Sequence, residues 1–305
     1  MTWLYKALIQ KFISFLPYSH RINYLLQRYL TVGKELHHSF VIDKLNHAQK
    51  HIKSFAEFGN TSLEKAKILE IGTGWYPIVP IVFYLSGSNN IETTDIRKLY
   101  CKKSIDQALR SIIKLFNENS IRELIPKYQE DRIETLKLAL NQKRIHSKFD
   151  LLKIKSTIYK SSDYAISSKS KDFIVSNNTI QYIKKTDMIP LFSELARIGE
   201  SGSVLSLAID FTDEFSHFDR SISNFNFLKF SERKWKRITW RSYSVNRLRY
   251  TDIKKHIVNH FHLRSEEIIN GKTQELEEVS IHKQFSQYNT EELLVKHVHI
   301  VAENY

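Results

Sequence analysis

Short apolar runs alternate with amphipathic segments through the middle of the chain. Runs bounded by turn residues predict buried strands at 66–71, 90–95, 172–177 and 203–210. A charged region with helical spacing, Tyr100 to Arg144, separates the second strand from the third. Strands that alternate with helices are typical of a doubly wound, Rossmann-like sheet, so the predicted fold class is α/β.

The first sixty residues predict helices. Apolar side chains recur at helical spacing from Trp3 to Leu16, from Arg21 to Tyr29 and from Phe40 to Phe58. We therefore expect an N-terminal helical cap, 1–60, packed on a main domain, 61–305. The stripe from Trp3 to Leu16 has a second interpretation, because an aromatic-rich basic helix also suits peripheral contact with the inner face of a membrane.

The end of the chain predicts a helix, a polar stretch and a last strand. The helix runs from Ile253 to Phe261, and the strand covers 293–303. Its alternation of apolar and basic residues is typical of an edge hairpin strand. His297 and His299 share one face of this strand, where a solvated or structural role is expected.

Composition narrows the class of protein. Of 305 residues, 42% are hydrophobic and 12% aromatic, which indicates a folded globule. A lone cysteine, Cys101, allows no intramolecular disulfide or thiolate cluster, so a cytoplasmic setting is expected. No apolar run is long enough to span a membrane, and the start lacks a small-residue cleavage site. A net charge of +13 would attract a nucleic acid, an anionic membrane or a phosphate-bearing substrate. In the alternative interpretation, the charged residues only cover solvated faces.

The segment 68–76, ILEIGTGWY, is the strongest motif. A buried strand reaches Glu70, and the chain then turns at Gly72 and Gly74 before a long apolar segment. Glycines there let backbone N–H groups approach a ligand that any Cβ would push away. A second strand ends at Asp95, where an acid suits ribose hydroxyls. This layout predicts a nucleotide-binding βα unit.

The acid-x-Gly-x-Gly order resembles class I S-adenosylmethionine-dependent methyltransferases more than dinucleotide dehydrogenases, because Pro77 follows Trp75-Tyr76 and a third glycine is absent. The resemblance implies S-adenosyl-L-methionine as cofactor and a Rossmann-like sheet of the methyltransferase type. It also implies roles for single residues. Glu70 would lie near the methionine amino group, Gly72 and Gly74 under the sugar, Asp95 at the ribose and Asp163 at the adenine amino group. A turn or N-cap is the alternative for Asp163.

The strand 172–177 ends in polar residues that should face the cleft beyond its carboxyl end. Ser176 and Asn177 are candidates for cofactor contact, and Asn178 and Tyr182 for acceptor contact. Methyltransferases that act on exocyclic base amines carry an (N/D)-P-P-(Y/F) turn here. Ser-Asn-Asn-Thr lacks both prolines, which argues against that subgroup.

Acids and a histidine cluster after the strand 203–210, in the order Asp210, Asp213, His217 and Asp219. A divalent-metal site, a simple turn and a general base are the three interpretations. We expect no metal. His217 is the candidate base, oriented by Asp213 or Asp219, with Asp210 facing the acceptor.

The stretch 209–252 resembles a group of bacterial methyltransferases encoded among sugar and surface-polysaccharide biosynthesis genes. The shared pattern is Ile209-Asp210, Asp213, Phe215, His217-Phe218-Asp219, Asn226-Phe227-Leu228-Lys229-Phe230-Ser231, Trp235, Asn246-Arg247-Leu248-Arg249 and Asp252. With the glycine motif, the resemblance covers roughly residues 60–265. Group members often carry histidines where this chain has Leu207-Ala208 and Tyr182, which leaves His217 as the surviving one.

The resemblance makes 211–252 an acceptor-side insertion and implies O-methylation of a saccharide-like or other small hydroxylated acceptor. Arg247 and Arg249 would present guanidinium groups to an anionic acceptor. In the alternative interpretation they pair with Asp213, Glu232 or Asp252. A second functional hypothesis is a basic RNA-binding methyltransferase or a non-catalytic nucleic-acid-binding protein.

Overall fold

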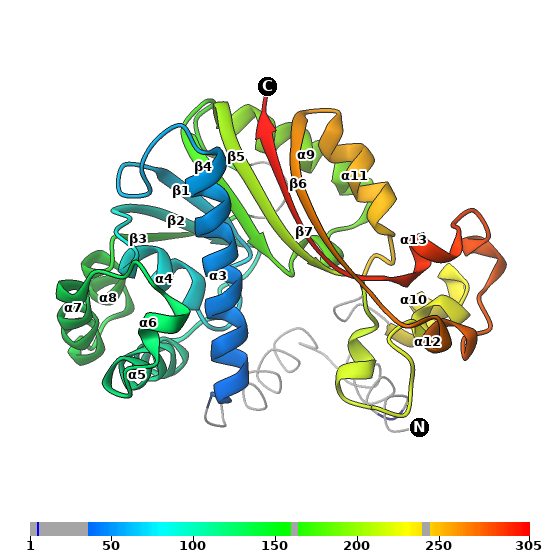
Figure 1. Ribbon diagram of the computed structural model, residues 1–305, viewed down its shortest axis with the longest axis horizontal. Helices are drawn as coiled ribbons and strands as arrows, with labels where there is room; N and C mark the ends of the chain where they lie inside the picture. Colours follow the sequence, from blue (N-terminus) through cyan, green and yellow to red (C-terminus); the bar gives the residue numbers. More distant parts are fainter. Residues whose placement is uncertain (1–4, 6–35, 160–163, 240–244) are drawn as a thin grey trace, which may run out of the picture.

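A mixed sheet forms the centre of the computed structural model, which describes Tyr5 and residues 36–159, 164–239 and 245–305 (Figure 1). In these residues the sheet has seven strands in the order β3-β2-β1-β4-β5-β7-β6. In chain order they are β1 (Lys67–Ile71), β2 (Asn90–Asp95), β3 (Ile154–Ile158), β4 (Lys171–Asn177), β5 (Gly199–Asp210), β6 (Phe261–Asn270) and β7 (Val295–Asn304). Strand β7 runs antiparallel to both of its neighbours, β5 and β6, and the other pairs of strands are parallel.

The four strands predicted from apolar runs are confirmed as β1, β2, β4 and β5. Two others, β3 and β6, were not predicted. Both are edge strands with mostly exposed or half-exposed residues, so they lack the apolar run that marks a buried strand. The strand predicted at 293–303 is confirmed as β7, but its predicted position at the edge is wrong, because β7 lies between β5 and β6.

Helices cover both faces of the sheet (Figure 1). One hydrophobic cluster joins the sheet to α3 (His38–Phe58), α4 (Ile78–Leu85), α5 (Lys102–Asn117), α6 (Ile121–Leu124), α7 (Glu130–Asn141) and α8 (Ile145–Leu151). A second cluster joins it to α9 (Met188–Ile198) and α11 (Tyr250–Val258). The predicted doubly wound α/β fold class is therefore confirmed.

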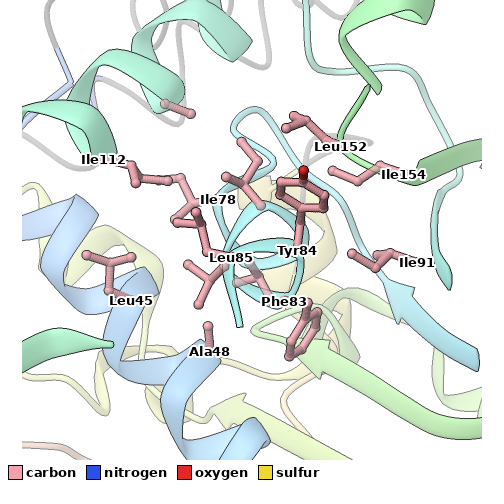
Figure 2. Packing of buried hydrophobic residues seen from close by; sticks show 14 of the residues in the cluster. Leu45, Ala48, Ile78, Phe83, Tyr84, Leu85, Ile91, Ile112, Leu152 and Ile154 are labelled. Atoms are coloured by element: carbon pink, nitrogen blue, oxygen red, sulfur yellow. The ribbon is translucent and has the colours of Figure 1, made fainter. Parts of the chain in front are cut away.

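The first cluster is built around α4, the helix that follows the glycine motif. Every residue of its sequence IVPIVFYL is buried, as expected of a helix that is apolar on all sides. Figure 2 shows Leu45 and Ala48 of α3 on one side of α4, with Ile91 and Ile154 of the sheet on the other. This packing fixes the start of α4, and therefore the glycine loop in front of it.

Helix α3 confirms the helix predicted from Phe40 to Phe58 and runs antiparallel to β4. Near its end Phe55 stacks on Phe173 of β4, with 4.6 Å between ring centroids. One turn earlier, His51 reaches Asn177, the last residue of β4. The first half of α3 therefore extends past the carboxyl edge of the sheet.

A third hydrophobic cluster lies beside the sheet and includes Phe225, Phe227 and Trp235 of the predicted insertion. The cluster also contains residues from outside the predicted insertion. They come from the segment between β6 and β7, which holds α12 (Thr273–Glu277) and α13 (Thr290–Leu294). Figure 1 shows α12 and α13 beside α10 (Glu232–Thr239) at one end of the molecule.

The two predicted stripes at Trp3–Leu16 and Arg21–Tyr29 lie outside the described residues, apart from Tyr5. Membrane docking through them stays a prediction. In the described part of the chain, no helix combines the length and the hydropathy needed to cross a membrane.

Phe173 joins both helices to the sheet, because its ring contacts Phe55 of α3 and Phe83 of α4. We expect Phe173→Ala to lower the free energy of unfolding by about 3–5 kcal/mol, the usual cost of emptying a buried aromatic site. Chemical denaturation of both proteins measures this. Phe218→Ala, which removes a ring that is 68% exposed, is the matched control and should change it by less than about 0.5 kcal/mol. Equal effects would contradict this account of the core.

Candidate functional site

The glycine loop adopts the backbone that its sequence predicted. Gly72 and Gly74 have φ of 89° and 66°, in the region that favours glycine. A Cβ on Gly72 would lie 1.9 Å from Thr179 Oγ1, so the loop after β4 packs directly against this residue. Next to Gly74, in contrast, the position of a Cβ meets no atom within 4 Å. The loop thus leaves open space beside Gly74, where a ligand can approach its backbone.

Asp95 is tied to the same loop across the sheet. Its carboxylate accepts hydrogen bonds from the backbone N–H groups of Gly74 and Arg97, at 3.0 and 3.2 Å. Burial raises the pKa of Asp95, and these two hydrogen bonds oppose that rise. The structure therefore brings together Asp95 and Gly74, as the motif predicted.

Glu70 lies beneath the loop and is only 2% exposed. Its Oε2 accepts a hydrogen bond of 2.6 Å from Thr93 Oγ1, which also lies 2.5 Å from Thr73 Oγ1. Burial raises the pKa of Glu70 to about 7, although the Thr93 bond and the charge of Lys44 act in the other direction. A buried acid that is half-protonated near neutral pH suits a cationic partner, because the positive charge would ionise it fully.

The polar residues at the end of β4 make different contacts. Ser176 is fully buried, and its hydroxyl donates to the Ile71 carbonyl at 3.0 Å, so it supports the loop from below. Asn178 has a φ of 50°, and its N–H donates to the Ala208 carbonyl. Asn177 turns toward α3, and its buried Nδ2 finds no hydrogen-bond partner among the residues that the structure describes. Asp163, the predicted adenine ligand, lies outside the described residues.

A chain of buried polar groups connects α3 to the sheet, and sequence reasoning missed it. His51 Nε2 lies 3.0 Å from Asn177 Oδ1, and His51 Nδ1 lies 2.7 Å from Ser206 Oγ. Ser206 Oγ in turn lies 2.9 Å from His299 Nε2. Because Asn177 Oδ1 only accepts, His51 carries its proton on Nε2 and accepts from Ser206 at Nδ1. His299 then donates to Ser206.

The sequence contained only a weak indication of these hydrogen-bonded histidines. His51 stands in the apolar stripe of a predicted helix, and His299 was expected to be solvated or structural. The structure gives His299 the structural role, since burial lowers its pKa to about 4. The pKa of His51 is also held well below its usual range, mainly because the ring is buried and secondly because of the charge of nearby His299. Both imidazoles are therefore neutral at pH 7.

Asp210, the last residue of β5, holds the acceptor-side histidines. Its Oδ2 lies 3.5 Å from His217 Nε2, and its Oδ1 lies 3.6 Å from His297 Nδ1. Thr212 donates to Oδ1 through both its N–H and its hydroxyl. Burial favours a higher pKa for Asp210, but its bond to His217 and the charge of His297 outweigh it, so the pKa is lowered. Asp210 is the carboxylate that orients His217.

The predicted orienting acids, Asp213 and Asp219, do not hold His217. Asp213 is buried, accepts from the Phe215 N–H at 2.9 Å and from Asn226 Nδ2 at 3.1 Å, and so shapes its own loop. Burial raises the pKa of Asp213 to about 6. Asp219 accepts from the N–H and the hydroxyl of Ser221. Sequence neighbours were the wrong choice because the short 3-10 helix Glu214–His217 turns the imidazole back toward β5.

The two arginines of the NRLR motif are internal supports, which corrects their assignment to the acceptor. Arg249 is fully buried and donates to the carbonyls of Phe211, Glu292, Leu293 and Val295. Arg247 donates to the carbonyls of Phe227 and Phe230 and to Glu232, at 2.6 Å from its Oε2. Pairing with Glu232 was the alternative interpretation, and it is confirmed. Tyr182 packs against the third cluster.

Among the described residues, no group of three or more histidines, cysteines or acids is arranged to hold a metal ion. The polar side chains that do gather lie at the carboxyl ends of β1, β2, β4 and β5 and at the start of β7. In open α/β sheets this edge is where ligands bind.

Comparisons with known proteins give distant structural likenesses. No family model and no curated sequence matches the chain. Geranyl diphosphate C-methyltransferase from Streptomyces coelicolor A3(2), whose structure contains Mg²⁺, geranyl diphosphate and S-adenosyl-L-homocysteine, is similar at 11% identity, with a TM-score of 0.46 over 84% of this chain and 79% of that one. A methyltransferase of unconfirmed activity from Bacillus halodurans C-125 is 11% identical, with a TM-score of 0.42 over 83% of this chain and 98% of that one. The [4+2]-cyclase SpnF is 8% identical, with a TM-score of 0.44 over 84% of this chain and 80% of that one.

The buried chain of histidines makes stability depend on pH. His299 has a folded pKa of about 4 and an unfolded value near 6.5, so its stabilising effect is present above pH 6.5 and is lost as the pH falls toward 4. From pH 7 to pH 5 this one residue should cost about 2 kcal/mol of unfolding free energy. Denaturation at both pH values measures it.

His299→Gln should flatten this pH dependence, whereas His38→Gln, at an exposed position of α3, should leave it unchanged. An equally steep loss of stability in His299→Gln would show that His299 does not cause it.

Proposed function

We propose that this protein is an S-adenosylmethionine-dependent O-methyltransferase that acts on a saccharide-like or other small hydroxylated acceptor. One observation carries the proposal. A nucleoside-binding frame of Glu70, Gly74 and Asp95 lies on the same sheet edge as an imidazole, His217, held by the carboxylate of Asp210. The proposed donor site and the proposed proton acceptor therefore lie along one edge of the sheet.

The frame fits the cofactor in three respects. The open space beside Gly74 admits a sugar against the backbone, and Asp95 stands beside it to accept ribose hydroxyls. The buried Glu70 suits the ammonium of the methionine part. Asn177 adds a buried Nδ2 donor at the end of β4 that has no partner in the described part of the chain. We include Glu70, Gly72, Gly74, Asp95 and Asn177 in the proposed cofactor site.

The chemistry asked of the protein is modest. When bound, S-adenosylmethionine supplies a methyl group that its sulfonium has already activated. The proposed site holds the acceptor hydroxyl in line with that methyl group, and His217 takes the hydroxyl proton as the oxygen gains the methyl. Because Nε2 of His217 faces Asp210 Oδ2 and Thr212 Oγ1, its Nδ1 is the nitrogen that receives the proton. Asp210 then stabilises the imidazolium.

Two experiments test the function directly. Isothermal titration with S-adenosyl-L-homocysteine should show one site per chain, weakened by Asp95→Ala through loss of the ribose bonds. A methyl-donor assay against panels of sugars and sugar nucleotides, with mass spectrometry of the products, identifies the acceptor. Wild-type protein that binds neither the cofactor nor its product contradicts the proposal.

The net charge of +13 supports a second candidate, a methyltransferase or adaptor that binds RNA. Such a protein should bind RNA with an affinity that falls steeply as salt rises, because each phosphate contact releases counterions. A gel shift with a structured RNA at two salt concentrations separates the candidates. The small-molecule enzyme should show only weak binding at physiological salt.

The raised pKa of Glu70 makes cofactor binding pH-dependent. Since the ammonium of the ligand needs an ionised Glu70, affinity for S-adenosyl-L-homocysteine should rise as the pH rises from 6 to 8 through the Glu70 pKa of about 7. Titrations in buffers of different ionisation enthalpy should also detect proton release at pH 6. Glu70→Gln should bind roughly 10-fold more weakly, with no proton release from this residue. A wild-type affinity that does not vary with pH would exclude this role.

The His217 base predicts a pH-rate profile. Its bond to Asp210 is the main cause that raises the pKa of His217, and burial opposes it. Methyl transfer should therefore increase as the pH rises through that pKa, and Asp210→Asn should move the rise to lower pH. His217→Ala should lower kcat by about 10²–10⁴-fold. His146→Ala on α8, with a side chain that is 85% exposed, is the control and should retain wild-type kcat. A pH profile unaffected by Asp210→Asn would contradict the pairing.

A further inference from the structure

One lysine of α3 is placed over the glycine loop without a firm partner. At the start of the helix, the Phe40 ring lies 5.7 Å from the Tyr76 ring, just after the loop. Further along, His51 contacts Asn177 at the end of β4. Lys44 is one turn after Phe40 and two turns before His51, so all three side chains leave α3 on the same face. Lys44 therefore projects above the carboxyl ends of β1 and β4.

The ammonium of Lys44 is largely enclosed yet weakly held. Its side chain is 18% exposed, and Nζ lies 5.6 Å from the centre of the Phe40 ring. Its carboxylate neighbour, Asp43 at 3.8 Å, is the preceding residue and is 54% exposed. Pairs of that kind contribute little to stability. Among the described residues, Lys44 Nζ makes no hydrogen bond, so only the weak Asp43 pair and the Phe40 ring offset its desolvation.

The surroundings of Lys44 indicate what it binds. Burial lowers the pKa of Lys44, and the charges of Asp43, Glu70 and Asp210 oppose this. In return, Lys44 is the cation whose charge acts on Glu70. A buried acid and an enclosed cation thus act on each other through their charges, and among the described residues no hydrogen bond joins them. An α-amino acid carries an ammonium and a carboxylate on one carbon, and it matches such a separated pair.

We propose that Lys44 and Glu70 form a clamp for the α-amino-acid end of the ligand, in which Lys44 binds the carboxylate and Glu70 binds the ammonium. This inference rests on the proposed function and deepens it, because it states how the helix α3 recognises the cofactor. Neither motif in the sequence pointed to Lys44, which lies in the predicted cap far from the glycine loop in the chain.

The test compares two ligands that differ by the amino-acid end. S-adenosyl-L-homocysteine has it, and 5′-methylthioadenosine lacks it. In isothermal titrations, Lys44→Met should weaken binding of S-adenosyl-L-homocysteine by roughly 10- to 100-fold, the effect of losing a hydrogen bond between charged groups. Binding of 5′-methylthioadenosine should change less than about twofold. Lys44→Arg should restore part of the affinity, because it keeps the charge.

Lys53→Met is the matched control, because Lys53 is an exposed lysine of the same helix. It should leave both affinities unchanged, and far-UV circular dichroism should show native helix content in all variants. Equal losses for both ligands in Lys44→Met, or no loss for either, overturn the clamp while the methyltransferase proposal stands. Wild-type protein that binds neither ligand overturns both.

Discussion

The contact between α3 and the carboxyl edge of the sheet is the constraint on which the site depends. His51 connects α3 to Asn177 of β4 and, through Ser206 of β5, to His299 of β7. Three strands and one helix are therefore positioned by one set of buried hydrogen bonds. Such a set is sensitive to each member, because a buried polar group that loses its partner keeps its full desolvation cost.

Buried charged groups have different partners in the third cluster and at the carboxyl edge of the sheet. Arg247 and Arg249 are surrounded by backbone carbonyls, so their charges order the loops of the third cluster. At the sheet edge, in contrast, Glu70 is nearly inaccessible and has no cation bonded to it in the described residues. The arginines therefore have a structural role, whereas a buried acid with a raised pKa at this edge is a candidate for binding.

The acceptor side is assembled from segments that are distant in the chain. Asp210 ends β5, His217 follows in a 3-10 helix, and His297 comes from β7. The antiparallel pairing of β5 with β7 puts Asp210 directly opposite His297. The proposed cofactor site therefore lies on parallel strands, and the proposed acceptor site lies where the strand direction reverses.

Local patterns in the sequence determined the parts of the molecule that depend on local physics. Apolar runs identified four buried strands, and positive φ at Gly72 and Gly74 agrees with the turn that two glycines predicted. Asp95 is bonded to the Gly74 N–H because the end of a parallel strand meets the loop of its neighbour, which spacing alone anticipates.

Tertiary structure alone decided the rest. The polar edge strands β3 and β6 have no buried face to mark them, so their pairing comes from the neighbours. The partner of His217 is Asp210 and not a closer acid, because direction in space and not separation in sequence sets a hydrogen bond. Lys44 and His51 read as ordinary members of an amphipathic helix. Only the packing of α3 across the ends of β4 and β5 bonds His51 to the sheet and brings Lys44 close enough for its charge to act on Glu70.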